Sequence, residues 1–209
     1  MAPPVKILDR LVAAGLCLCP NPGMTSLPTL WLPILLSAVF VFVASSLVHM
    51  VLQLHKGDYR KLPNEDGLLD ALRSTGTGPG QYMFPCAESM KEMGSPEMGA
   101  KFARGPIGTL IVRPGGSLNM GQALGTWFGF CLLFGLLVAY LTGLVKAPGA
   151  DGVFRFASAA AALGYAFSSV PDSIWKGVRW STTARFVFDG IVYALVTGAT
   201  FAWLWPTAA

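Results

Sequence analysis

Two charged residues, Arg185 and Asp189, lie in an apolar stretch near the end of the chain. A charge at membrane depth is costly to bury and is often functional. Four residues apart on a helix, the two can form an ion pair, and an acid near a helix N-terminus is stabilised by the helix dipole. We therefore expect Asp189 to be a structural anion paired with Arg185. The alternative is a role in ion or proton movement, with His49 and Tyr193 lining the path.

The histidines are the next candidates for chemistry. His49 and Gln53 are four residues apart and are predicted to share one face of the first membrane span, and His55 follows at its end. Histidines can ligate haem or metal, but a two-haem membrane cytochrome needs histidine pairs on facing helices, and the other predicted spans contain none. A hydrogen bond to a neighbouring helix or to the membrane interface is the expected role. The sequence leads us to predict no metal and no cofactor.

Motifs typical of enzymes are absent from the sequence. The loop Gly76–Gly80 lacks the Gly-Lys-Ser/Thr ending of a phosphate loop, and no nucleophile-elbow or zinc-protease motif occurs. The cysteines Cys17, Cys19, Cys86 and Cys131 show neither zinc nor haem-attachment spacing. We therefore expect a protein that is not an enzyme.

The composition defines the environment of these residues. Of 209 residues, 53% are hydrophobic and only 12% are charged, whereas soluble domains contain about 25% charged residues. Four spans are expected, over residues 30–54, 119–145, 152–170 and 185–205, the third needing residues beyond Pro171 to reach full length. The sequence predicts an all-α membrane protein: a four-transmembrane-helix bundle with a short cytoplasmic cap between helices 1 and 2. In domain terms, residues 1–27 form an N-terminal tail, 28–55 helix 1, 56–117 an extramembrane loop region and 118–209 helices 2–4.

The loop region 56–117 is polar and rich in glycine and proline. Asn64 is predicted to cap a helix over 65–73, and Ser95-Pro96-Glu97 is typical of another helix start. A short strand is predicted over 109–112. We expect these pieces to fold onto the bundle as a cap without a core of its own.

Lysines and arginines predict the orientation. The loop region carries eight and the connection before the fourth span three, against four on the opposite side. By the positive-inside rule, the loop region lies in the cytoplasm and both termini lie outside, in a bacterial inner membrane. The formal charge of +4 is explained by this pattern, because no basic cluster indicates nucleic-acid binding.

Small residues recur every four positions in three spans, an arrangement that lets membrane helices approach closely. The second span has Gly121, Gly125 and Gly129, the fourth has Gly190, Ala194 and Gly198, and the third has Ala160, Gly164 and Ser168. Three such faces favour packing inside one tight bundle.

The leading functional hypothesis is a non-catalytic accessory or scaffold subunit of a bacterial inner-membrane complex, with the lipid bilayer and other membrane subunits as partners. A small transporter or channel subunit is the alternative, followed by a membrane enzyme acting on lipid or quinone.

Overall fold

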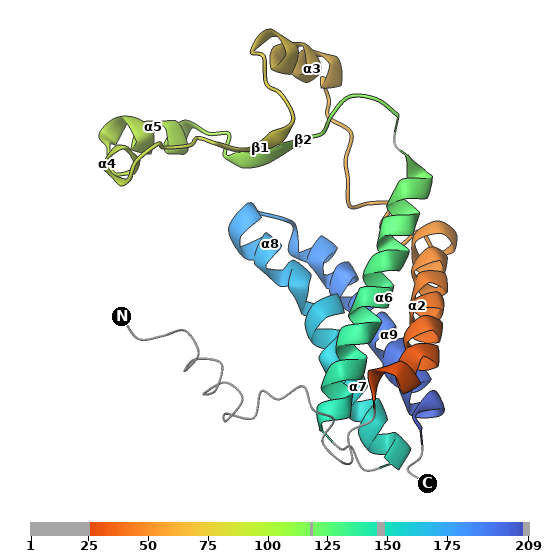
Figure 1. The fold of residues 1–209 in the computed structure, drawn as a ribbon. Coiled ribbons are helices and arrows are strands. Elements are labelled where there is room, and N and C mark those ends of the chain that lie inside the picture. The colour runs from red at the N-terminus through yellow and green to blue at the C-terminus, as the bar shows by residue number, and fades with distance from the viewer. Residues whose placement is uncertain (1–25, 118, 146–148, 207–209) are drawn as a thin grey trace, which may run out of the picture.

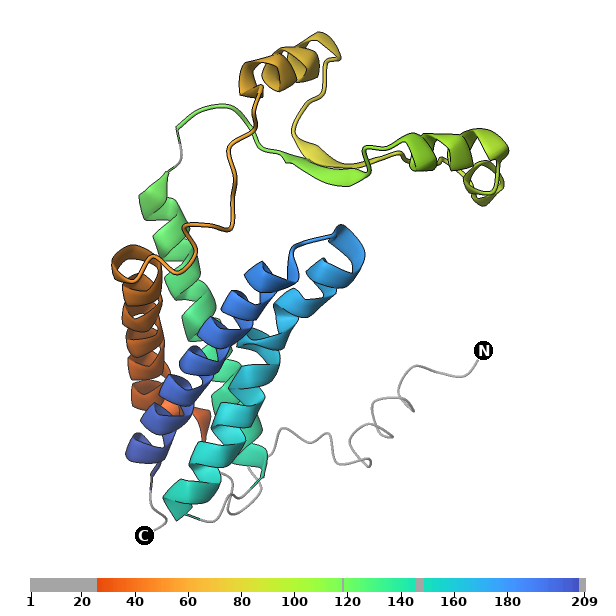
Figure 2. The same cartoon turned by 180° about the vertical axis from the view of Figure 1, so that it is seen from behind.

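Four helical segments dominate the computed structural model, which describes residues 26–117, 119–145 and 149–206. The segments Leu27–Val51, Met120–Leu144, Gly149–Lys176 and Trp180–Leu204 are each long and apolar enough to cross a membrane. They lie side by side and alternate in direction (Figures 1 and 2). Most of the predicted N-terminal tail, with Cys17 and Cys19, lies outside the described residues.

The first segment is assembled from three helical pieces. A 3₁₀ turn (η1, Leu27–Leu30) leads into α2 (Trp31–Ser46), which ends in a π-helical turn (η2, Leu47–Val51). Helical structure therefore stops four residues before the predicted boundary at residue 55. The π turn widens the last turn of the helix around His49, and such turns are frequent at functional sites.

The third segment continues through its proline, as the sequence required for it to be long enough. Helix α7 (Gly149–Tyr165) is followed by a 3₁₀ turn, η3 (Phe167–Ser169), and by α8 (Val170–Lys176). Pro171 occupies the first turn of α8, where its missing N–H costs no helical hydrogen bond. Gly177, at a φ of +72°, ends α8.

The second and fourth spans are single helices of 25 residues, α6 (Met120–Leu144) and α9 (Trp180–Leu204). The Asn119 side chain caps α6. Helix α9 starts at Trp180, five residues before the predicted start at Arg185. Asp189 thus lies about two and a half turns into the helix, beyond the first turn over which the dipole acts, so the predicted dipole stabilisation of Asp189 is wrong.

Helices α7 and α9 pack most closely, and glycines on α9 make this possible. A Cβ added at Gly190 would lie 2.3 Å from the Ala166 Cα and from the Tyr165 carbonyl oxygen. At Gly198 it would lie 2.9 Å from the Phe154 carbonyl oxygen. Ala194 is buried between these two glycines. The buried face of α7 is Val153, Ala157 and Ala161 rather than the predicted stripe: Gly164 of that stripe meets the Phe134 ring of α6, and Ser168 is exposed.

The glycines in the first half of α6 behave differently. At Gly125 and Gly129 an added Cβ would meet nothing within 4 Å, and at Gly121 it would meet only the Asn119 side chain at 3.5 Å. Within α6 it is Gly135, closer to the other end, that contacts the first span, at Ile34 and Ser37. The packing role predicted for Gly121, Gly125 and Gly129 is therefore not filled by the described part of this chain.

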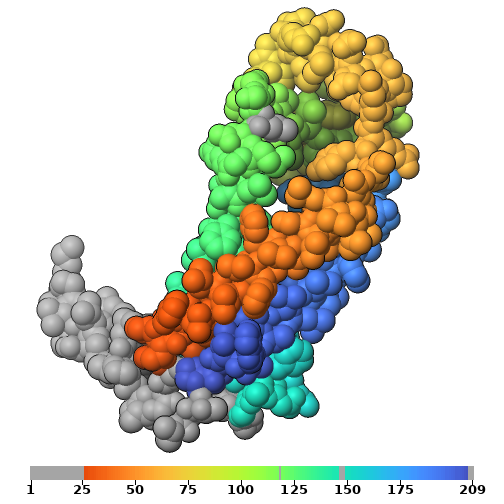
Figure 3. Space-filling view, turned by 90° about the vertical axis from the view of Figure 1, so that its right-hand side faces the viewer, coloured from red at the N-terminus to blue at the C-terminus, as the bar shows by residue number. Residues whose placement is uncertain are grey.

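The loop region forms a lobe at one end of the four helices (Figure 3). Its elements are α3 (Glu65–Ser74), β1 (Gly80–Phe84), α4 (Met90–Met93), α5 (Pro96–Arg104) and β2 (Gly108–Val112). The strands form an antiparallel hairpin with Gly80 opposite Val112. The Asn64 and Ser95 side chains cap α3 and α5, as predicted, and β2 lies where a strand was expected. The sequence analysis did not predict β1 or α4.

The predicted cap is wrong in one respect. Among residues 56–117 the only buried apolar residue is Met98, and α3, α4 and α5 project away from the bundle instead of folding onto it (Figure 1). The region does lack a core of its own. Its large apolar side chains, such as Met90, Ile107 and Ile111, are spread over short elements and stay exposed, so no packed apolar face holds its helices against the bundle.

Both basic segments lie at the same end of the bundle. Thr109 in β2 donates a hydrogen bond to the carbonyl oxygen of Lys176 (3.4 Å), and Arg179 binds the loop base at the Gly57 carbonyl oxygen (2.7 Å). Two spans separate these segments along the chain, so both end at the same side of the bundle. The count of lysines and arginines predicted this arrangement.

Candidate functional site

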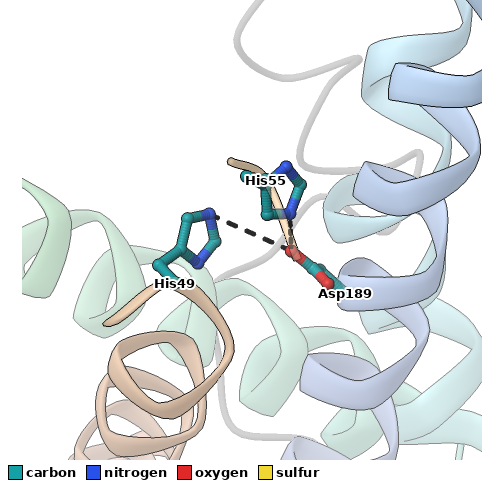
Figure 4. A group of neighbouring side chains, drawn as sticks. All are labelled: His49, His55 and Asp189. Carbon is teal, nitrogen blue, oxygen red and sulfur yellow. Dashed lines mark hydrogen bonds and ion pairs between the residues drawn. The ribbon is translucent and has the colours of Figure 1, made fainter. Parts of the chain in front are cut away.

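Three side chains that could bind a cation meet at the loop end of the bundle. They are His49 of η2, His55 beyond the end of the first span, and Asp189 of α9 (Figure 4). The Asp189 Oδ2 atom lies 2.7 Å from the His55 Nε2 and 4.0 Å from the His49 Nε2. We call these three residues the histidine–aspartate site. They include both histidines of the chain.

The segment after η2 reverses direction to deliver His55. The chain turns at Gln53, which has a φ of +49°, a conformation that residues other than glycine seldom adopt. The next turn is closed by the Lys56 N–H, which donates to the Gln53 carbonyl oxygen (3.1 Å). As a result the His55 ring stacks on the His49 ring, with centroids 4.5 Å apart and planes 5° apart.

His55 is held between two carboxylates. Its Nδ1 lies 2.6 Å from the Asp58 Oδ2, and its Nε2 lies 2.7 Å from the Asp189 Oδ2. An ionised carboxylate only accepts hydrogen bonds, so His55 satisfies both acids when it carries a proton on each nitrogen. The arrangement is then a cation between two anions.

Asp58 anchors this arrangement from the loop side. Its Oδ1 accepts hydrogen bonds from Thr182 (3.1 Å) and from Arg185, both on α9. Burial raises the pKa of Asp58, but the hydrogen bonds from His55, Thr182 and Arg185 outweigh it and hold the pKa below its ordinary value. Asp58 is therefore an anion at neutral pH.

His49 is oriented by its own helix. Its Nδ1 lies 3.0 Å from the Ser45 carbonyl oxygen. Since a carbonyl oxygen can only accept, Nδ1 carries the proton, and in the neutral ring Nε2 keeps a lone pair on the side of Asp189. The His49 side chain is 43% exposed, against 2% for Asp189, so the site opens to the surface at His49.

Asp189 is incompletely satisfied. Its side chain is buried, and its Oδ1 has no hydrogen-bond partner among the described residues. The same holds for the Tyr193 hydroxyl, one turn further along α9. Beyond Tyr193 the bundle interior contains small and apolar side chains such as Ala194 and Phe201. It also contains Thr197 and Thr200, whose hydroxyls donate to carbonyl oxygens of α9 itself.

The structure changes two predictions about these residues. Arg185 is bound to Asp58 and Asp189 to His55, so the predicted Arg185–Asp189 pair is wrong. Gln53 lies beyond the end of η2 and is exposed, so it does not share a helix face with His49. Tyr193 is buried near Asp189, as its position four residues later implies.

Sequence reasoning missed Asp58 as a site residue. It also did not predict that His55, which follows the first span, lies beside Asp189. A signal was present: Asp58 is the first acid after a span that contains His49 and is followed by His55.

By the length and composition of its helices, the chain has the architecture of a multi-pass membrane protein, with two buried carboxylates, Asp58 and Asp189, and two imidazoles at one end of the bundle. No protein-family model, curated protein or solved structure matches the chain, so its function is argued from its own geometry.

Proposed function

We propose that the chain is a non-catalytic accessory or scaffold subunit of a bacterial inner-membrane complex, and that the first half of α6 binds a transmembrane helix of another subunit. The open glycine face at Gly121, Gly125 and Gly129 carries this proposal.

Two glycine faces of the bundle have the same spacing but different surroundings. On α9, the face at Gly190 and Gly198 is pressed against the backbone of α7, with no room for a Cβ. On α6, a Cβ added at Gly125 or Gly129 would meet no atom of the described residues within 4 Å. In lipid, helices associate through close packing rather than through the hydrophobic effect. The glycine face of α6 therefore contributes to packing when a second helix occupies it.

The loop region supports the same proposal. Its surface exposes large apolar side chains, among them Met90, Ile107 and Ile111, which are 87%, 62% and 62% exposed. The region lies at the end of the bundle where α6 begins (Figures 1 and 2). A partner that packs on the glycine face can therefore also cover the loop region. The positive-inside rule places this end in the cytoplasm and both termini outside.

The proposal is tested by purifying the full chain from its native membrane in gentle detergent and measuring the mass of the particle. We expect a stoichiometric complex with at least one other membrane subunit. Gly125→Leu should dissociate it, because the added side chain occupies the space of the partner helix. Ala123→Leu is the matched control, since Ala123 is exposed and lies on the opposite side of α6. A monomer, an assembly of this chain alone, or a complex equally tolerant of both changes would overturn the proposal.

A transporter or channel subunit is the second candidate, favoured by the contact of Asp189 with the partly exposed His49. Asp189, His49 and Tyr193 would line the path. Vesicles reconstituted with the protein should then show an ion or proton flux that Asp189→Asn abolishes. Absence of a flux that depends on Asp189 would exclude this function.

A further inference from the structure

We propose that the histidine–aspartate site binds one divalent first-row transition-metal ion, with Zn²⁺ as the best-matched probe, through the Nε2 atoms of His49 and His55 and the carboxylate of Asp189. The proposal is independent of whether the chain assembles with another subunit.

The donor set fits such an ion. Imidazole nitrogen and carboxylate oxygen are ordinary ligands of Zn²⁺ and of neighbouring divalent ions, and three protein ligands with an open fourth position are typical of accessible zinc sites. One donor atom from each of the three residues lies within 4.8 Å of the others. The exposed edge at His49 provides the open position, where water or a small ligand would complete the coordination.

Two of the three ligand separations require small shifts, and the two imidazole rings, which are parallel in the structure, must also tilt so that both Nε2 lone pairs point at one ion. With bonds of about 2.0–2.1 Å and tetrahedral angles, ligand atoms around Zn²⁺ lie roughly 3.3 Å apart. The contact between His55 Nε2 and Asp189 Oδ2, 2.7 Å in the structure, would open by about 0.6 Å, and that between His49 Nε2 and Asp189 Oδ2, 4.0 Å, would close by about 0.7 Å. On binding, the ion takes the place of the proton on the His55 Nε2, which is released to water.

The surroundings of the ligands provide the strongest support. A histidine that binds a metal usually donates its other ring N–H to a carboxylate or a backbone carbonyl, which fixes the ring and its tautomer. Both versions occur here. The His55 Nδ1 faces the Asp58 carboxylate, and the His49 Nδ1 faces the Ser45 carbonyl oxygen. Both Nε2 atoms are thereby directed toward Asp189 (Figure 4).

Two further observations distinguish this site from a simple ion pair. Asp58 is itself held by Arg185 and Thr182, so the residue that orients His55 is fixed from α9. Asp189, 2% exposed, keeps one oxygen without a hydrogen-bond partner among the residues described. A cation held by both oxygens of the carboxylate would supply that missing partner, whereas the contact of Oδ2 with His55 leaves Oδ1 unsatisfied.

The test is Zn²⁺ titration by calorimetry of the full chain in lipid nanodiscs, purified without a polyhistidine tag and with its cysteines changed to serine. We expect one equivalent to bind. Because each ligand contributes a coordinate bond, His49→Ala, His55→Ala and Asp189→Asn should each weaken binding by at least tenfold. Asp172→Asn is the matched control: Asp172 is a half-exposed acid at the same end of the bundle, paired with Lys176, and its change should leave binding unaltered.

A second measurement keeps the proposal testable if a variant fails to fold. Co²⁺ added to the unaltered site should give the visible absorption of a four- or five-coordinate ion, and Zn²⁺ should abolish it by displacement. No binding by the protein with its site intact, or binding that survives all three ligand substitutions, would overturn the proposal. In that case the site is only a contact between the end of the first span and α9.

Discussion

The two glycine faces make opposite predictions for the same substitution. Gly190→Ala places a methyl group 2.3 Å from the Ala166 Cα and the Tyr165 carbonyl oxygen, about 1 Å closer than van der Waals contact allows. Both obstacles are backbone atoms, so no side-chain rotation relieves the clash, and α7 and α9 must separate. Gly125→Ala places the same methyl group where no atom of the described part of the chain lies within 4 Å.

The magnitudes follow from two opposing terms. Replacing glycine by alanine inside a helix stabilises it by up to about 1 kcal/mol, at either position. Inserting a methyl group into a packed contact costs about 1–3 kcal/mol, and occasionally more. Because the obstacle at Gly190 is backbone, we expect the upper end of that range, a net loss of about 2 kcal/mol or more. Gly125→Ala should leave the free energy of unfolding unchanged or raise it by up to about 1 kcal/mol.

The assay is denaturant unfolding of the isolated chain in mixed micelles, followed by circular dichroism. The Gly190→Ala transition should move to lower denaturant, and the Gly125→Ala transition should not. Equal shifts for the two variants, or a Gly190→Ala chain as stable as the unaltered protein, would refute the close α7–α9 packing.

Three further predictions concern the residues around the site. The losses of stability caused by Asp58→Asn and Arg185→Gln should be non-additive by about 1 kcal/mol, because the two residues form a pair and Arg185 is 38% exposed, so that the pair is partly screened. A larger coupling between Asp189 and Arg185 in the same thermal melts would instead support an Arg185–Asp189 pair. The pKa of Asp58 lies below its ordinary value of 3.8 in the folded state, so its contribution to stability is present above about pH 4 and lost as the pH falls through the lowered folded value. Melting curves between about pH 5 and about pH 3 should therefore fall less steeply for Asp58→Asn than for the unaltered chain, and identical slopes would contradict this. Gln53→Val should cost about 1–2 kcal/mol because a β-branched residue is strained at a φ of +49°, whereas Gln53→Gly should cost nothing, and equal melting temperatures for both would argue against the turn.

Much of the local structure was predictable because its signals lie within a few residues. Asn64 caps α3 by accepting from the Gly67 N–H, and Ser95 caps α5 by accepting from the Met98 N–H, each three residues along the chain. The apolar stretches likewise predicted four helices long enough to cross a membrane. Here chain-local chemistry is sufficient.

The partners of the charged residues were not predictable in the same way. Arg185 and Asp189 are four residues apart, which made them a plausible pair, but each binds a residue more than a hundred positions away. Asp58 and His55, which bind these two residues, reach α9 because the chain turns at Gln53 after η2. The sequence contains no glycine at that turn to indicate it.

The sequence by itself determined the apolar segments and their number, the capped helices of the loop region, and the end of the bundle at which the basic residues gather. The reason is that helix capping depends on residues close together in the chain, while hydropathy and charge are determined by how each segment interacts with the bilayer. Only the tertiary structure decided which glycine face is filled and which acid binds which cation. Both outcomes depend on how helices distant in the chain approach one another, and a four-residue spacing is the same on a packed face of α9 as on an open face of α6.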